Sequence, residues 1–138
     1  MAPTILFLHH PPFPLGVDYF REMLLRNGDE LETLLDRHPQ VKHVAFGHVH
    51  LTAYGWSSGR SFSATRGTCH PIHPLFEGMS TRYVDRPPSY EVVLVEGGRI
   101  LAHSMEVADM IVAREYADDD GGPGRIELLK PEVQWARK

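Results

Sequence analysis

Short apolar runs separated by turn residues dominate the first half of the chain. Residues 4–8 form a continuous apolar run of the kind found in a strand that is buried on both faces, and residues 41–46 predict the next strand. The segment between them predicts two helices, one over 18–26 and a second that Asp29 caps and that ends near residue 37. The order of strand, helix and strand predicts a parallel βαβ unit.

The second half of the chain has the pattern of antiparallel hairpins. Two pairs of apolar runs, each flanking a glycine-containing turn, predict hairpins over 51–65 and 90–105. We therefore expect an α/β fold that starts with a parallel βαβ unit and continues with antiparallel hairpins. Residues 1–106 are assigned to one domain, and 107–138 to a linker and C-terminal tail, because 118–124 is an acidic, glycine-rich stretch typical of flexible linkers.

Composition narrows the class of protein further. The 138 residues carry a net charge of −4, which gives no sign of a nucleic-acid-binding surface. A single cysteine, Cys69, excludes an intrachain disulfide and favours a reducing compartment. No run approaches the roughly 20 apolar residues of a membrane span, and the first residues do not have the pattern of a signal peptide. We expect a cytoplasmic protein without a membrane partner.

Four of the nine histidines lie in two short clusters, each directly after an apolar run. The clusters are His9-His10-Pro11-Pro12 and Gly47-His48-Val49-His50. Because parallel strands end at the same edge of a sheet, we expect the clusters to converge. In an extended segment His48 and His50 project to the same side and face one cavity, and Gly47 allows the backbone to turn. Imidazole is a common metal ligand, so the pattern predicts a metal site; ordinary loop histidines are the alternative.

These two motifs, together with Gly67-Thr68-Cys69-His70, resemble the C-terminal half of the calcineurin-like metallophosphoesterases. The most similar branch contains the class III cyclic-nucleotide phosphodiesterases and the glycerophosphodiesterases, and the resemblance covers residues 3–105. It implies half of a metallophosphoesterase-type αββα sandwich. It also implies hydrolysis of phosphodiesters by a metal-bound hydroxide, with a phosphodiester or phosphomonoester small molecule as substrate.

The resemblance assigns roles to individual histidines. His9 and His48 would bind one metal and His50 the other, in a site for two divalent or trivalent ions of the Fe, Mn, Zn or Co class. His10 fills a variable position and is not expected to be a ligand. His70 matches a histidine beside the substrate phosphate, so it is the candidate catalytic residue, with a solvated loop histidine as the alternative.

Three motifs of the family have no counterpart before the first histidine cluster: Asp-x-His, Gly-Asp-x-x-Asp and Gly-Asn-His-Asp. The segment 28–32 echoes the second motif but follows the histidines, so it is interpreted as a helix start. The bridging carboxylate is therefore missing. We expect at most one bound ion and little activity, as for a split gene product, a truncated reading frame or one half expressed alone.

Three functions remain open on this basis. The first is a phosphoesterase in which this chain supplies the histidine-rich half and an N-terminal half acts in trans. The second is a non-catalytic oligomerising or regulatory remnant, and the third is a single-metal-binding protein. A strand over 4–8 without its sheet neighbours also predicts a homo-oligomer.

The other histidines and the cysteine are interpreted without a metal role. We expect His38 and His43 to be solvated, His73 to lie at the surface, and His103 to lie at the surface or the edge of the core. Cys69 is expected to be a small buried apolar residue, with a reactive thiol beside His70 as the alternative.

Overall fold

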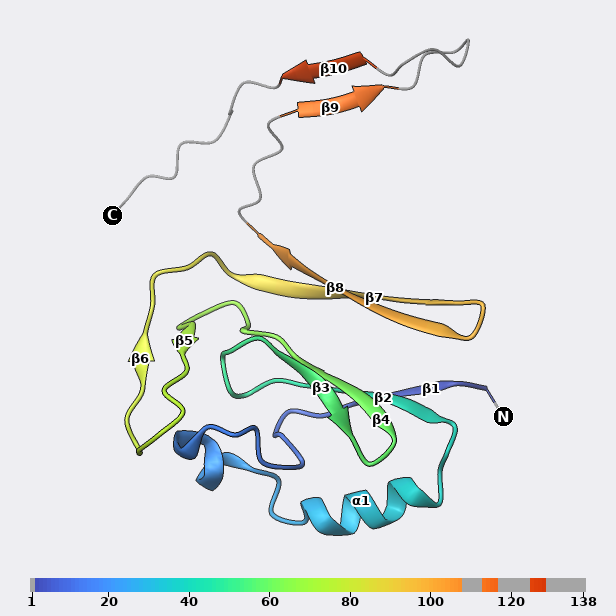
Figure 1. The fold of residues 1–138 in the computed structure, drawn as a ribbon, viewed down its shortest axis with the longest axis vertical. Coiled ribbons are helices and arrows are strands. Elements are labelled where there is room, and N and C mark those ends of the chain that lie inside the picture. The colour runs from blue at the N-terminus through green and yellow to red at the C-terminus, as the bar shows by residue number, and fades with distance from the viewer. Residues whose placement is uncertain (1, 108–112, 117–124, 129–138) are drawn as a thin grey trace. The chain divides into compact units, whose positions relative to one another are not determined.

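The computed structural model describes residues 2–107, 113–116 and 125–128 (Figure 1). The chain divides into two compact units, Met1–Val107 and Ala108–Lys138. Every candidate site residue lies in the first unit. No helix in the described part of the chain is both long and apolar enough to cross a membrane.

The described residues of the second unit form one antiparallel pair of strands. Strand β9 (Ala113–Tyr116) pairs with β10 (Arg125–Leu128). The acidic linker predicted over 118–124 lies outside the described residues.

A mixed four-stranded sheet, in the order β1-β2-β4-β3, forms the centre of the first unit. Strand β1 (Thr4–Phe7) runs parallel to β2 (Val41–Phe46), and helix α1 (Gly28–Asp36) connects them, which confirms the predicted βαβ unit. Strand β3 (Ala53–Ser57) pairs antiparallel with β4 (Arg60–Ala64), as the first predicted hairpin requires. The α/β class is confirmed, while its interpretation as half of a metallophosphoesterase-type αββα sandwich stays a prediction.

The side chains of strand β1 are exposed or only half-buried, so the prediction that both of its faces are buried is wrong; β1 also lies at the edge of this sheet. The Phe7 side chain is 67% exposed, and Ile5 and Leu6 are half-buried. A continuous apolar run indicates that a strand has apolar surface to bury, but it does not show whether a neighbour is present to cover it. The edge of β1 that faces away from β2 pairs with no strand in the described part of the chain.

The helical segment between β1 and β2 is shorter than predicted. A 3₁₀ helix, η1 (Asp18–Met23), replaces the helix expected over 18–26. Helix α1 begins at Gly28 after the N-cap residue Asn27, so Asp29 lies in the first turn and is not the cap. At this position its carboxylate still interacts favourably with the positive end of the helix dipole.

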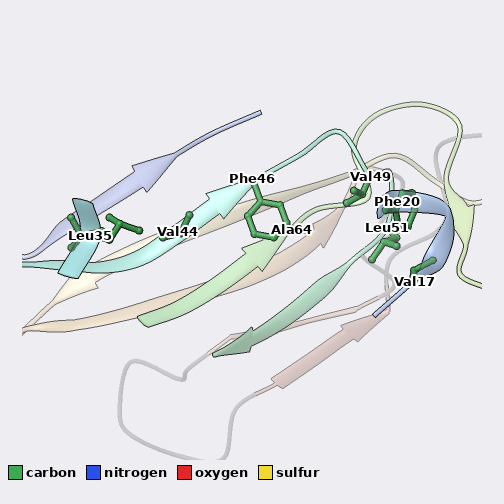
Figure 2. Packing of buried hydrophobic residues seen from close by; sticks show 9 residues of the cluster. Val17, Phe20, Leu35, Val44, Phe46, Val49, Leu51 and Ala64 are labelled. Atoms are coloured by element: carbon green, nitrogen blue, oxygen red, sulfur yellow. The ribbon is translucent and has the colours of Figure 1, made fainter. Parts of the chain in front are cut away.

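The hydrophobic core lies between α1 and the sheet and continues beneath the loop that follows β2 (Figure 2). Leu35 of α1 packs with Val44 and Phe46 of β2. Phe20 of η1 and Val49 of the loop extend the cluster, with exposed fractions of 1% and 0%. Since Val49 stands between His48 and His50, its burial holds the backbone of the second histidine cluster against the core.

The second predicted hairpin is also present. Strand β7 (Ser89–Glu96) pairs with β8 (Arg99–Glu106), and a two-residue pair, β5 (Ile72–His73) with β6 (Arg82–Tyr83), lies in the loop before them. Figure 1 shows β7–β8 and α1 on opposite sides of the four-stranded sheet. Arg66 forms an ion pair with Glu106, which joins the segment after β4 to the end of β8.

His43 lies on the side of β2 where the hairpin packs, so the prediction that it is solvated is wrong. Its ring is buried, with nitrogens 2.9 Å from Ser61 Oγ and 3.0 Å from Ser63 Oγ. Ser63 in turn donates a hydrogen bond of 2.7 Å to Glu91 of β7. Burial lowers the pKa of His43, and the negative charge of Glu91 opposes this shift.

Candidate metal centre

The two histidine clusters meet at the ends of β1 and β2. The parallel ladder continues past both strands: Leu8 donates a hydrogen bond of 2.9 Å to the Ala45 carbonyl, and Gly47 one of 3.1 Å to the His9 carbonyl. His9 Nε2 then lies 3.1 Å from His48 Nδ1. Of the predicted convergence, the His9–His48 part is confirmed, because parallel strands bring their carboxyl ends to one edge.

His48 lies in a tight turn, so the prediction of an extended segment is wrong. Val49 donates a 2.8 Å hydrogen bond to the Gly47 carbonyl, which places His48 at the centre of a γ-turn with φ 68°. His50 is also left-handed, with φ 49°, whereas Gly47 is not. Burial of Val49 requires the chain to turn sharply on both sides, and the strain falls on the two histidines. Such strain costs of the order of 1–3 kcal/mol per residue and is concentrated at functional sites.

His10 joins His9 and His48 in the first group of potential ligands, although the resemblance gives it no such role. One ring nitrogen from each of the three lies within 4.8 Å of the others. His10 Nδ1 is 3.1 Å from the Met23 carbonyl, so it carries the proton and leaves the Nε2 lone pair free. In the sequence, the feature that could have indicated this role for His10 is its position directly after His9.

The spacing of this group suits a single ion. Two nitrogens bound tetrahedrally to zinc at about 2.0–2.1 Å lie roughly 3.3 Å apart, and the His9–His48 separation is 3.1 Å. Burial lowers the pKa of His48, and His10, His9 and His50 lower it further. A lowered pKa keeps the imidazole neutral, which is the form that binds a metal.

His50 belongs to a second group, with Cys69 and His70. The ligand atoms of these three residues also lie within 4.8 Å of one another. Cys69 is exposed, so the prediction of a buried apolar cysteine is wrong. It lies in the loop after β4, which does not cross the core. His38, His73 and His103 are exposed and belong to neither group.

A cavity of about 310 Å³ adjoins both groups. His48 and His50 both line it, as predicted, but through two left-handed residues rather than an extended strand. Phe20 and Met23 supply apolar surface, and His70 also contributes to the lining. This volume is near the lower end of the range for small-molecule sites.

Neither group contains a carboxylate in the part of the chain that the structure describes. Three neutral imidazoles are a suitable donor set for one borderline ion such as Zn²⁺, Co²⁺ or Fe²⁺. They supply no negative charge to hold two cations a few ångströms apart, so the donor set fits single ions better than a bridged pair.

No family model matches the chain. It is 39% identical over 71 residues to a 3',5'-cyclic adenosine monophosphate phosphodiesterase of Escherichia coli, which is 51% of this chain and 26% of that protein. A probable cyclic nucleotide phosphodiesterase of Rhodopseudomonas palustris is 32% identical over 104 residues, 73% of this chain and 37% of that protein. A glycerophosphodiester phosphodiesterase of Enterobacter lignolyticus is 30% identical over 87 residues, 63% of this chain and 31% of that protein.

The resemblance to cyclic-nucleotide and glycerophosphodiester phosphodiesterases is confirmed. The chain spans between 26% and 37% of the length of these three relatives. The similarity therefore concerns a segment of each relative.

Proposed function

We propose that the chain supplies the histidine-rich half of a metal-dependent phosphodiesterase centre. The observation that carries the proposal is the 3.1 Å approach of His9 Nε2 and His48 Nδ1 at the ends of two parallel strands. Similarity to phosphodiesterases over 51% and 73% of the chain supports the choice of chemistry.

In this centre His9 and His48 hold one ion, and His50 faces the second position across the shared cavity. A bound ion of this class supplies a Lewis acid and lowers the pKa of its water to about 7. Val49 is fully buried and keeps its two neighbours, His48 and His50, in place without contacting the substrate. His70 lines the cavity and donates a hydrogen bond to a phosphate oxygen of the bound phosphodiester.

The carboxylates of the centre come from the missing N-terminal half, outside these 138 residues. Residues 1–106 form the histidine-rich half of the domain, and the match covers only 26% to 37% of each of the three relatives, so 63% to 74% of their length lies outside it. A two-ion clamp needs a group that bridges the ions and offsets their charge. We expect the isolated chain to be nearly inactive for this reason.

The test is complementation with a chromogenic phosphodiester and Mn²⁺. The chain is assayed alone and with the part of the E. coli phosphodiesterase that lies outside the matched 71 residues. We expect negligible turnover alone and turnover with the fragment that His48→Ala abolishes and His38→Ala leaves unchanged. His38 is the matched control because it is exposed and belongs to neither group.

Turnover by the chain alone at about 1 per second or faster, lost in His48→Ala, would show that the half-site proposal is wrong. Failure of complementation, together with metal binding that His48→Ala leaves unchanged, would favour the second function. That function is a non-catalytic oligomerising or regulatory remnant, and the absence of a carboxylate from both ligand groups in the described residues favours it.

A further inference from the structure

The second ligand group contains a thiol, which distinguishes it chemically from the first. His50, Cys69 and His70 each offer one donor atom, and these atoms lie within 4.8 Å of one another. Two of the three residues, His50 and His70, have positive φ angles of 49° and 46°. Two strained non-glycine residues facing one exposed thiol indicate a local arrangement that the surrounding structure holds in place.

The loop that carries Cys69 and His70 is attached to the second histidine cluster by two hydrogen bonds. The Ile72 amide donates a hydrogen bond of 2.9 Å to the His50 carbonyl, and His50 Nδ1 donates one of 3.2 Å to the His70 carbonyl. The second bond has a chemical consequence. With the proton on Nδ1, the His50 Nε2 lone pair is free, as in metal-binding histidines whose other nitrogen donates to a carbonyl.

We propose that His50, Cys69 and His70 form a thiolate-containing metal site of this chain, suited to Zn²⁺. Two imidazoles and one thiolate leave the fourth tetrahedral position open to water or another ligand. The soft sulfur selects Zn²⁺ over Mg²⁺ or Mn²⁺. Binding deprotonates the Cys69 thiol and releases one proton to solvent.

This site uses none of the ligands of the first group, and it shares His50 with the second metal position of the proposed phosphodiesterase centre. Its metal binding is measured without phosphodiesterase activity. It raises the number of ions beyond the single one that the missing bridging carboxylate led us to expect for the isolated chain. In the chain by itself His70 serves as a ligand, because neither ligand group in the described residues offers a carboxylate to this ion. A carboxylate from a second polypeptide would replace it and free the ring for a phosphate.

The test uses the full 138-residue chain and Co²⁺ as a spectroscopic substitute for Zn²⁺. We expect a thiolate-to-cobalt charge-transfer band that Zn²⁺ removes by displacement. Cys69→Ser should abolish the band and reduce the Zn²⁺ stoichiometry by one. Because Cys69 is exposed, this substitution leaves the fold intact, which thermal unfolding checks.

Four histidine variants separate this site from its surroundings. The affinity for Co²⁺, measured by titration of this band, should fall in His50→Ala and in His70→Ala. Each loss should exceed the roughly 10- to 100-fold that removal of an outer-shell partner costs. His9→Ala, in the first group, and the exposed His103→Ala should leave the band unchanged. Absence of the band at saturating Co²⁺, or its persistence in the double variant of His50 and His70, would overturn the proposal. Neither result bears on the complementation assay.

Discussion

At the scale of single residues, His48 is held in a backbone conformation that favours glycine. Its φ of 68° places it at the centre of a γ-turn. A side chain at such a position costs about 1–2 kcal/mol relative to glycine. The imidazole that approaches His9 is therefore kept at the expense of stability.

Replacing His48 by glycine and by alanine separates strain from the loss of the ring. We expect His48→Gly to have a free energy of unfolding about 1 kcal/mol higher than His48→Ala. Lys42, exposed within β2, is the control, because there glycine should be less stable than alanine by about 0.5–1 kcal/mol. Urea unfolding of the four variants measures both differences. If glycine were less stable than alanine at position 48 as well as at position 42, the strained turn would be contradicted.

Gly28 is a second residue whose identity the packing requires. A Cβ at this position would lie 2.1 Å from the Pro12 carbonyl oxygen, so the start of α1 touches the backbone of the first histidine cluster. Leu25 fixes the same contact with a 2.8 Å hydrogen bond to the Pro11 carbonyl. The orientation of the His9-His10 segment thus depends on a close approach that only glycine permits.

We expect Gly28→Ala to destabilise the protein by about 1–3 kcal/mol, as overpacking does. Alanine gains up to about 1 kcal/mol of helix propensity at an interior helical position, but two backbones must separate to admit the methyl group. Gly47→Ala is the control, since its Cβ would meet nothing closer than 3.9 Å. Thermal unfolding compares the two, and a Gly28→Ala midpoint at or above that of the parent protein would refute the close contact.

At the scale of elements, a buried chain of polar groups links the sheet to the hairpin. It runs from His43 on β2 through Ser63 on β4 to Glu91 on β7. The pattern of β2 gave no sign of this, because Lys42 and His43 are adjacent polar residues and nothing in the strand distinguishes the buried one from the exposed one. The chain of hydrogen bonds satisfies polar groups that burial would otherwise leave without partners.

The depressed pKa of His43 predicts a loss of stability in acid. The folded state holds this ring neutral below the reference pKa of 6.5, so the unfolded state takes up a proton first. The contribution of neutral His43 to the free energy of unfolding is complete above pH 6.5, and it is lost as the pH falls through the lower pKa of the folded state. Within that window the slope approaches about 1.4 kcal/mol per pH unit.

His43→Gln removes the titrating group, so its free energy of unfolding should fall less steeply between pH 7 and 5 than that of the parent protein. His38→Gln, at an exposed position, should retain the parent slope. Urea unfolding at several pH values measures these slopes. A His43→Gln slope as steep as the parent's would show that His43 is not kept neutral by the fold.

At the scale of the whole molecule, the first unit leaves apolar surface uncovered. Phe7 on the edge strand is 67% exposed. On β7–β8, alternate positions of the hairpin face away from Glu91, and they are also exposed: Tyr90, Val92, Leu94, Leu101 and Met105. A patch of this kind on a sheet usually marks a surface that another polypeptide covers.

We predict a homo-oligomer in which the free edge of β1 takes part. Unpaired backbone groups on an edge strand pair readily with another chain, and a charge on the edge prevents this. Phe7→Lys should therefore shift the sedimentation profile towards the monomer at tens of micromolar. Leu34→Lys, an exposed apolar residue on α1, should not. A monomeric parent protein at that concentration would contradict the prediction.

The sequence by itself determined the strands, most of the local elements and the approach of His9 to His48. Residues 41–46 form β2 within the predicted bounds, and both hairpins lie where turn residues predict them, because apolar periodicity and turn chemistry are local properties. The approach of His9 to His48 followed from one non-local rule, that parallel strands end at the same edge. The resemblance to phosphodiesterases rested on the same short motifs.

Only the tertiary structure decided burial, backbone strain and the grouping of ligands. Phe7 is exposed and His43 buried because neighbours in space, and not the residue types, determine what is covered. His48 and His50 separate into two groups because buried Val49 forces a turn on each side. Cys69 reaches His50 through a loop closed by hydrogen bonds between positions far apart in sequence. Such contacts depend on how elements pack, which no local pattern of residues encodes.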